Sequence, residues 1–399
     1  MNRPPISTTL SDRVRSLEAT PMRAMVDLAS DQDTDSINLA FGDPDFDTPA
    51  HIVEEAMEAA SAGGTHYTDN FGIEALRAAI ASEYESAGVP VDPDREIAVT
   101  AGAIQGLAFA TLAVADPGDE IVVLTPAWPS YFTQAGVANA TLLTVPLSPE
   151  EDFALDGSRV AAAIGDDTAA VILSSPSNPT GQVFDHEEIE TVIDAAAAND
   201  AWIIADEVYW RLVYGDEFES VAALTDYDRL IVANSASKTY AMTGWRVGWL
   251  VGPPTVIESM AQLHQAFSTC ASSVSQHALL AALEGPQEPI REMHTAYRDR
   301  RDYVLDRIES IPGIEVPEPQ GGFYVFPDVR ALGDSSLDVA RQLVHEAGVV
   351  TAPGVGFGDA GEGHLRISFA SDMETLATAF DRIEAFAGDV VDADSDVQS

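Results

Sequence analysis

Lys238 is the only lysine in a chain of 399 residues. At the average abundance of charged residues, a chain of this length would carry roughly 25 lysines. The lysine side chain is a primary amine that can condense with a carbonyl group, whereas the guanidinium of arginine stays protonated and cannot do so. The single lysine therefore indicates Schiff-base chemistry; the alternative is that drift in composition left one lysine by chance.

Other polar residues follow apolar, strand-like segments. SSPSNPTG at 174–181 comes after one such segment, and Asp206 ends the next, with Tyr209 close behind it. Lys238 follows a third segment, and Arg246 comes shortly after. Ligands of open α/β sheets bind where the carboxyl ends of the strands meet. Taken singly, each group has a simpler explanation, because Asn, Pro and Gly form turns and an aspartate can cap a helix.

In this order, the motifs Asn-Pro-Thr-Gly, Asp-x-x-Tyr, Ser-x-Ser-Lys and Gly-Trp-Arg resemble those of the class I and II aminotransferases, which are fold-type-I pyridoxal-phosphate enzymes. The resemblance runs over residues 11–386. INLAFGDPDFDTP at 37–49 and YTDNFGIEALR at 67–77 are similar to the N-terminal signatures of the family, and GGFYVF at 321–326 and HLRIS at 364–368 to its C-terminal ones. The resemblance implies transamination between an L-amino acid and a 2-oxo acid, with pyridoxal 5′-phosphate (PLP) as cofactor.

The resemblance also implies roles for single residues around the cofactor. Lys238 would hold PLP as a Schiff base and carry a proton, and Asp206 would pair with the protonated pyridine nitrogen. Tyr209 and Asn178 would hydrogen-bond the ring 3′ oxygen, and Trp128 would stack on the ring unless it is an ordinary core residue. The phosphate would take backbone amides at a strand-to-helix turn together with hydroxyl groups and a cation, from Gly102, Ala103, Ile104, Ser235, Ser237 and Arg246.

The substrate contacts that the resemblance implies begin with Arg366, whose planar fork suits an α-carboxylate. Gly42 would let its backbone approach the same group, and Trp128 and Asn178 also adjoin the substrate. Two further residues, Arg23 and Tyr67, have contacts that depend on the folded chain or on a second subunit. Arg23 either reaches the distal carboxylate of aspartate or glutamate or pairs with a carboxylate of its own segment, and Tyr67 would cross a homodimer interface to the partner's phosphate, so that the subunits share active sites.

The amino donor that these residues imply is aspartate or an aromatic amino acid, with an acceptor such as 2-oxoglutarate. A β-eliminating lyase or a decarboxylase on the same fold is the main alternative reaction. A pyridoxal-sensing transcription regulator would need an N-terminal DNA-binding domain, and only a short arm precedes Gly42.

Composition narrows the classes of partner and the compartment. Twenty basic against 65 acidic residues give a formal charge of −45, which opposes compaction unless concentrated salt screens the charges. We therefore expect a halophile's cytoplasmic protein that binds neither nucleic acid nor membranes. Cys270 is the only cysteine, which excludes an intrachain disulfide, and we find no secretory signal and no apolar run long enough to span a membrane.

The pattern of apolar segments predicts an α/β fold of the fold-type-I PLP-transferase kind. Strands are expected at 96–100, 120–124, 169–173, 202–205, 230–233 and 247–251, and helices lie between them, for example at 105–115 and 186–198. These would form a large, mostly parallel sheet of the seven-stranded type. The expected division is an N-terminal arm and part of a small domain at 1–46, a large PLP-binding domain at 47–285, a small α+β domain at 286–387 and an acidic disordered tail at 388–399.

Overall fold

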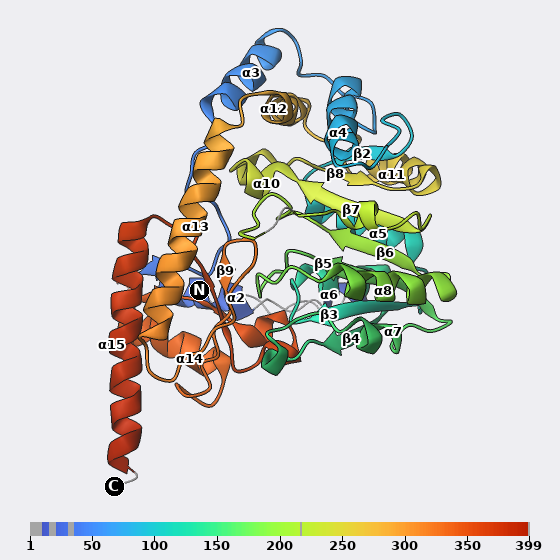
Figure 1. Cartoon of the computed structure of the whole chain (residues 1–399). Coiled ribbons are helices and arrows are strands. Elements are labelled where there is room, and N and C mark those ends of the chain that lie inside the picture. The colour runs from blue at the N-terminus through green and yellow to red at the C-terminus, as the bar shows by residue number, and fades with distance from the viewer. Residues whose placement is uncertain (1–9, 16–20, 31–35, 216–217, 398–399) are drawn as a thin grey trace.

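The computed structural model (Figure 1) describes residues 10–15, 21–30, 36–215 and 218–397. Its centre is a seven-stranded sheet in the order β2-β8-β7-β6-β5-β3-β4. All neighbouring pairs are parallel except those of β8, which runs antiparallel to β2 and β7. The strands are β2 (Ile97–Thr100), β3 (Glu120–Thr125), β4 (Thr141–Pro146), β5 (Thr168–Ser174), β6 (Trp202–Asp206), β7 (Leu230–Ser235) and β8 (Gly248–Val251). The mostly parallel α/β sheet predicted from the sequence is confirmed.

Alternate residues of the central strands belong to two different hydrophobic cores. In β5, Val171 and Leu173 belong to one hydrophobic cluster, whereas Ala170 and Ile172 belong to the other. Successive side chains of a strand point to opposite faces, so both faces of this sheet are buried. Continuous apolar runs are therefore the correct sequence signal for these strands.

Helices cover the two faces of the sheet and connect its strands. Around the sheet lie α3 (Ala50–Ser61), α4 (Glu74–Ser86), α5 (Ala103–Val114), α6 (Ser130–Ala138), α7 (Gly157–Ala161), α8 (His186–Ala198), α9 (Val221–Leu224), α10 (Ala236–Thr239), α11 (Pro254–Phe267) and α12 (Ser273–Glu284).

Strand β4 was not predicted. It lies at the edge of the sheet, and within the described part of the chain β3 is its only neighbouring strand. Of its residues Val145 is buried, whereas Thr141, Leu142 and Thr144 are exposed. An edge strand of this kind lacks the continuous apolar run that marks its buried neighbours.

The long helix α13 (Glu288–Glu309) leads from the sheet to the C-terminal part of the chain (Figure 1). This part contains a three-stranded antiparallel sheet in the order β11-β12-β9 and a parallel pair formed by β1 and β10. Because β1 comes from near the N-terminus, the N-terminal segment is part of the same structure. The elements are α1 (Asp12–Arg15), α2 (Pro21–Ser30), β1 (Ile37–Asn38), β9 (Tyr324–Val325), α14 (Ser336–Gln342), a π-helix (Leu343–Ala347), β10 (Val349–Val350), β11 (Ala352–Pro353), β12 (Leu365–Ser368) and α15 (Met373–Val397).

The prediction of a disordered tail from residue 388 is wrong for the described residues. Helix α15 continues to Val397, and residues 398–399 lie outside the described part of the chain. No glycine or proline follows Gly388 to interrupt the helix, and Val390 packs partly against the core. No helix in the described ranges is long and apolar enough to cross a membrane.

An ion pair fastens the segment after β1 to helix α13. Arg300 is 6% exposed and donates to both carboxylate oxygens of Asp45, at 2.7 and 2.8 Å. Its guanidinium also lies 4.8 Å from the ring centroid of Phe46. The pair holds the loop that carries Gly42 against the helix that joins the two parts of the chain.

Replacing Arg300 with leucine should lower the free energy of unfolding by about 2–3 kcal/mol, because Asp45 would lose its partner in a partly buried position. Arg291→Leu is the matched control, since the pair of Arg291 with Glu288 lies exposed on the same helix and should contribute less than about 1 kcal/mol. Denaturant unfolding in molar KCl measures both. Equal losses in the two variants would contradict the special contribution of the buried pair.

Candidate active site

A cavity of about 280 Å³ opens at the carboxyl ends of three neighbouring strands. The last residues of β5, β6 and β7, which are Ser174, Asp206 and Ser235, all line it. Most of the residues predicted from the sequence meet here: Gly42, Ala103, Ile104, Trp128, Asn178, Asp206, Tyr209, Ser235, Ser237, Lys238, Arg246 and Arg366. The cavity also takes residues that were not predicted, among them Met22, Phe41, Tyr131 and Tyr324.

Lys238 projects into the cavity from a short helix after β7. Ser235 caps this helix, because its Oγ accepts a hydrogen bond from the amide of Ser237 at 3.1 Å. The ammonium of Lys238 donates to the carbonyl oxygen of Gly42. Burial lowers the pKa of Lys238, although Tyr324 and other neighbours partly oppose the shift. A lowered pKa provides more of the neutral amine that attack on a carbonyl requires.

Asp206 is a buried carboxylate on the adjacent strand. It is 4% exposed and accepts hydrogen bonds from the hydroxyl of Tyr131 at 2.5 Å and from the amide of Val208 at 3.3 Å. Burial raises the pKa of Asp206 to about 6, against the opposing effect of these two hydrogen bonds and of Lys238. A positively charged ligand group beside this carboxylate would offset its loss of hydration.

Replacing Tyr131 with phenylalanine should move the acid limb of the pH profile of kcat/KM to higher pH by about one unit. The hydroxyl stabilises the ionised form of Asp206, so its loss raises the pKa of that carboxyl further. If the reaction needs ionised Asp206, activity then begins to fall at a higher pH. Tyr227→Phe is the control, because the hydroxyl of Tyr227 donates to the carbonyl of Ala201, which does not line the cavity. An unshifted limb in Tyr131→Phe would contradict the assignment.

Arg366 lies in the cavity wall, and not all of the N–H groups of its guanidinium donate hydrogen bonds. It is 3% exposed, and its Nη1 donates to Oδ1 of Asn178 at 2.8 Å. Its Nη2 donates to the carbonyl of Ala40, whereas its buried Nε has no hydrogen-bond partner among the described residues. The guanidinium stacks 4.3 Å from the ring centroid of Tyr324. A buried guanidinium with unused donor capacity suits a ligand carboxylate.

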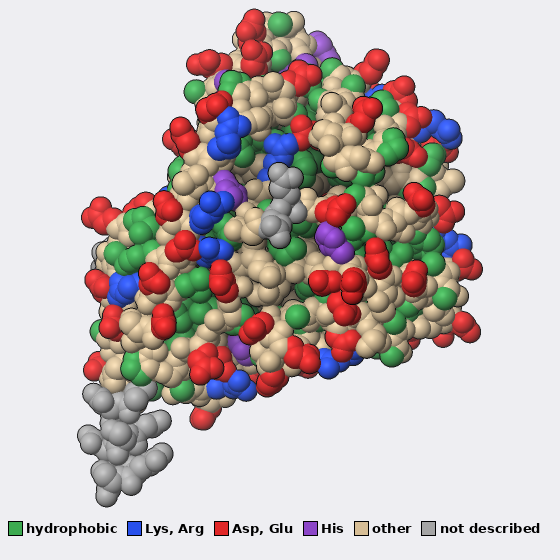
Figure 2. All heavy atoms as spheres, in the orientation of Figure 1, with side chains coloured by type: hydrophobic (Ala, Val, Ile, Leu, Met, Phe, Trp, Pro, Cys, Tyr) green, Lys and Arg blue, Asp and Glu red, His purple; other side chains and the backbone are tan. Residues whose placement is uncertain are grey.

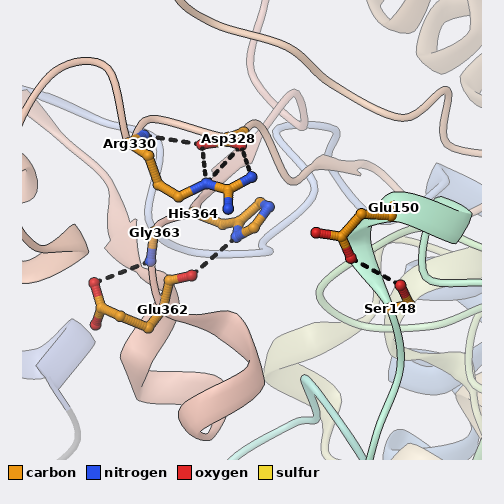
Figure 3. Close-up of polar contacts among 7 residues, drawn as sticks. All are labelled: Ser148, Glu150, Asp328, Arg330, Glu362, Gly363 and His364. Carbon is orange, nitrogen blue, oxygen red and sulfur yellow. Dashed lines mark hydrogen bonds and ion pairs between the residues drawn. The ribbon is translucent and has the colours of Figure 1, made fainter.

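The residues just before β12 make several polar contacts (Figure 3). His364 stacks on Phe326 at 5.1 Å between ring centroids, and its Nδ1 lies 3.1 Å from the carbonyl oxygen of Glu362. Burial lowers the pKa of His364, which favours the neutral form of its ring. Beside it Asp328 pairs with Arg330. These contacts hold the chain at the start of β12, two residues before Arg366.

The turn between β2 and α5 forms a cradle for an anion. Gly102 has a φ of 78°, and a Cβ at this position would lie 2.7 Å from Nη2 of Arg246. The amides of Ala103 and Ile104 begin helix α5 and have no carbonyl of the preceding turn to bond. Helix N-termini with an adjacent cation bind phosphate groups, so the predicted phosphate site has a suitable geometry.

Gly248 lets this cradle approach strand β7. A Cβ at Gly248 would lie 2.7 Å from the amide nitrogen of Ala103 and 2.6 Å from the carbonyl oxygen of Asn234. In β8 the residue pairs with Ser235 of β7. Only a residue without a side chain permits this contact between the start of α5 and the strand that precedes Lys238.

Three further predicted residues line the same wall. The hydroxyls of Tyr209 and Tyr324 are 3.2 Å apart. Gly42 lies against Tyr324 so closely that a Cβ would come within 1.5 Å of the tyrosine hydroxyl. Trp128 is half-buried and meets Tyr131 edge-on at 5.5 Å between ring centroids.

Three predicted residues do not line the cavity: Gly102 lies just behind it, next to Arg246, and Tyr67 and Arg23 lie farther away. Tyr67 is 84% exposed and lies apart from the cavity wall. Arg23 pairs with Asp27 one helical turn away, at 2.9 Å, and both side chains are exposed. The neighbouring Met22 lines the cavity instead, with its Sδ 3.3 Å from Nη2 of Arg366. Of the two interpretations of Arg23, the structure therefore shows the ion pair within its own segment.

The residues of the cavity fit PLP. An amine with a lowered pKa suits the carbonyl carbon, a buried carboxylate suits the pyridine nitrogen, and the cradle formed by Gly102 and Arg246 suits the phosphate. These groups come from adjoining parts of one sheet edge, so that a single molecule could contact all of them.

Comparison with known proteins agrees with this chemistry. Residues 34–383 match the family described as aminotransferase class I and II. An aspartate aminotransferase of Pyrococcus horikoshii is 38% identical over 378 residues, which cover 94% of this chain and 96% of the relative. The aromatic-amino-acid aminotransferase 2 of Thermococcus litoralis is 37% identical over 380 residues, covering 94% and 97%.

A solved structure shows the same relationship in three dimensions. A single mutant of Thermus thermophilus aspartate aminotransferase aligns with this chain at a TM-score of 0.90 and 36% sequence identity. The alignment covers 95% of this chain and 100% of the other. With the family match over most of its length, the chain belongs to the class I and II aminotransferases and is an enzyme of PLP-dependent transamination.

Proposed function

We propose that Lys238 binds PLP and that the residues around it carry out transamination. The observation that carries this assignment is the position of the only lysine. Its amine lies in the cavity with a lowered pKa, and the buried Asp206 ends the neighbouring strand. No other side chain of the protein offers a primary amine for the carbonyl carbon of the cofactor.

The bound cofactor supplies an electrophilic carbon for the amino group and a ring that accepts electron density from the substrate Cα. Asp206 holds the proton on the pyridine nitrogen. The amine of Lys238, once displaced by the substrate amino group, would carry the proton between the substrate Cα and the C4′ carbon of the cofactor. Tyr209 and Asn178 donate hydrogen bonds to the 3′ oxygen of the ring, and Trp128 stacks on the ring face.

The remaining residues bind and orient the cofactor and the substrate. The phosphate is held by amides at the start of α5 and by side chains near Lys238, namely Gly102, Ala103, Ile104, Ser235, Ser237 and Arg246. Arg366 binds the α-carboxylate of the substrate, beside the backbone of Gly42. Both the amino acid and the 2-oxo acid then present their reacting carbon to the same amine.

The donor is an amino acid of the aspartate or aromatic type, and the acceptor is a 2-oxo acid such as 2-oxoglutarate. The names of similar proteins support both donor types. Incubation with PLP, an amino acid and a 2-oxo acid in molar KCl should yield equal amounts of the new amino acid and the new 2-oxo acid. Release of ammonia with pyruvate, or of carbon dioxide, would instead indicate a lyase or a decarboxylase.

The active enzyme is a homodimer in which Tyr67 reaches the phosphate site of the other subunit. The exposure of Tyr67 supports this assignment, since 84% of a tyrosine surface faces solvent in the single chain. Mixing two inactive variants, Lys238→Arg and Tyr67→Ala, should restore activity, because one site of a mixed dimer has both residues intact. Failure to restore activity in mixed dimers would contradict shared sites.

The enzyme works in the cytoplasm of a halophile. Its formal charge of −45 supports this proposal, and Figure 2 shows acidic side chains spread over the whole visible face. At 1 M salt the Debye length is about 3 Å, so neighbouring carboxylates no longer repel each other strongly. Transfer from molar KCl to dilute buffer should unfold the protein, as measured by circular dichroism.

The proposed division of the chain follows the elements that build the site. Residues 47–285 form the large PLP-binding domain, and residues 286–387 form the small domain together with part of the arm at 1–46. The pairing of β1 with β10 and the ion pair between Asp45 and Arg300 support the assignment of the arm. Limited proteolysis in molar KCl should cut first between these parts.

A further inference from the structure

The loop that carries Tyr67 is irregular, and its shape depends on groups outside it. It joins α3 to α4, and helix α12 packs against both of these helices (Figure 1). Within the loop, the amide of Phe71 donates to Oδ1 of Asp69 at 2.8 Å, and the amide of Gly72 donates to the carbonyl oxygen of Asp69 at 3.0 Å. These local bonds shape one turn, so the rest of the path is set by contacts with other elements.

Gln276 of α12 bridges the two ends of this loop. It is 0% exposed, and its Oε1 accepts a hydrogen bond from the amide of Ile73 at 2.7 Å. Its Nε2 donates to the hydroxyl of Thr68 and to the carbonyl oxygen of Ala271, each at 3.0 Å. Thr68 directly follows Tyr67. Because a buried amide without partners is costly, the loop and the helix hold each other in one arrangement.

Helix α11 holds the middle of the loop. Nδ2 of Asn70 donates to the carbonyl oxygen of Ala261 at 3.1 Å. The ring of His264 is 0% exposed, and its Nδ1 lies 2.6 Å from the carbonyl oxygen of Asn70. Since a carbonyl only accepts, Nδ1 carries the hydrogen and donates it. Helices α11 and α12 together therefore fix the loop at residues 68, 70 and 73.

These anchors do not serve the cavity of the same chain. Tyr67 is 84% exposed, and Gln276, Thr68 and Ile73 are not among the residues that line the cavity. A side chain on a free loop loses conformational entropy when it binds, whereas a loop that is already fixed avoids much of this cost. The buried anchors thus suit a tyrosine that meets a group outside its own chain in one geometry.

We propose that Gln276 is a positioning residue that holds Tyr67 in the geometry required at the phosphate site of the partner subunit. This inference rests on the proposed function, in which two subunits share their active sites, and extends it to a residue outside the cavity. Gln276 acts through the loop, so its effect arises in the site of the other subunit and not in that of its own chain. A residue that only stabilised its own chain would lack this asymmetry.

Replacing Gln276 with leucine removes the hydrogen bonds at similar side-chain size and should weaken PLP binding by the homodimer roughly tenfold, because the phosphate loses a well-placed hydroxyl. Gln287→Leu is the matched control. Gln287 lies just beyond the other end of α12, where its Nε2 donates to the carbonyl oxygens of Ala282 and Gly285 at 2.9 Å each, and its variant should bind PLP as the wild type does. Titration of the cofactor-free proteins with PLP in molar KCl, followed by absorbance, measures both. Unchanged affinity in Gln276→Leu would contradict the proposal.

Mixed dimers, purified through two different tags, show which site Gln276 serves. In the pair of Gln276→Leu with Lys238→Arg, the one site with a lysine takes Tyr67 from the chain whose Gln276 is intact. This pair should therefore contain a site with wild-type affinity for PLP, measured as activity at limiting PLP. In the pair of Gln276→Leu with Tyr67→Ala, each site lacks either Tyr67 or its anchor, so neither site should reach that affinity.

The opposite pattern would show that Gln276 serves the site of its own chain and would overturn the proposal, as would equal behaviour of the two pairs. Asn70→Ala provides a second variant if Gln276→Leu does not fold. Asn70 is only half-buried, and its replacement should give the same pattern with a smaller loss of affinity. If Lys238→Arg paired with Tyr67→Ala regains no activity, the shared site itself is wrong and the inference about Gln276 fails with it.

Discussion

Replacement of Lys238 by arginine should reduce transamination on the order of 10⁵-fold or more. Arginine keeps the positive charge and much of the length of the side chain, but it cannot condense with the carbonyl of PLP. The loss would therefore report the chemistry of the amine and not a change in the electrostatics of the cavity. Steady-state rates of the variant and of the wild type in molar KCl, each corrected for the uncatalysed rate, measure this loss.

The lone lysine makes the point of attachment easy to identify. Reduction of the wild-type holoenzyme with borohydride should fix the cofactor to one peptide, the peptide that contains Lys238, because no other lysine exists. The arginine variant should show no cofactor bound to a lysine in the same peptide map. A covalently bound cofactor elsewhere in the wild type would overturn the assignment of Lys238.

Replacement of Asp206 by asparagine should lower kcat/KM by roughly 10³-fold and yet stabilise the cofactor-free protein at pH 7. Burial raises the pKa of this carboxyl from 3.8 to about 6, so the folded state binds the proton more tightly than the unfolded state. Stability from this source is present at low pH and is lost as the pH rises from about 4 to 6. A shift of this size corresponds to about 3 kcal/mol at pH 7, which asparagine removes.

The pH dependence of unfolding distinguishes this effect from a packing defect. At pH 7 the cofactor-free Asp206→Asn protein should melt at a higher temperature than the wild type, and the difference should shrink towards pH 4, where Asp206 is protonated. Asparagine can still accept the hydrogen bond of Tyr131, which limits other changes. A variant that is less stable by the same amount at both pH values would contradict the proposed cost of the buried charge.

The sequence predicts the central strands and many residues of the site for a common physical reason. Strands buried on both faces need continuous apolar runs, and the polar residues that follow such runs, such as Asp206 and Lys238, lie at the sheet edge where ligands bind. The edge strand β4 cannot be predicted in the same way, because most of its residues are exposed. The acidic composition of residues 388–397 favours disorder, whereas the absence of glycine and proline after Gly388 permits the helix that the structure shows.

Contacts between distant segments could not be predicted in this way. Tyr131 reaches Asp206 across 75 residues of sequence, and Tyr324 reaches Tyr209 across 115. A tyrosine in a helix or a short strand carries no local signal of such a partner. The segment with Arg23 shows the same limit, since only the folded chain reveals that Met22 faces the cavity while Arg23 turns to Asp27.

The contact at Gly248 ties the architecture of the sheet to the depth of the active site. A Cβ on Gly248 of β8 would lie 2.7 Å from the amide nitrogen of Ala103 in the first turn of α5, so the strand and the helix are packed closely at this point. One added methyl group would meet both the carbonyl oxygen of Asn234 in β7 and the first turn of α5, so the helix or the strand that leads to Lys238 must shift. The distance between the anion cradle and the amine of Lys238 would then change, although neither group had itself been altered.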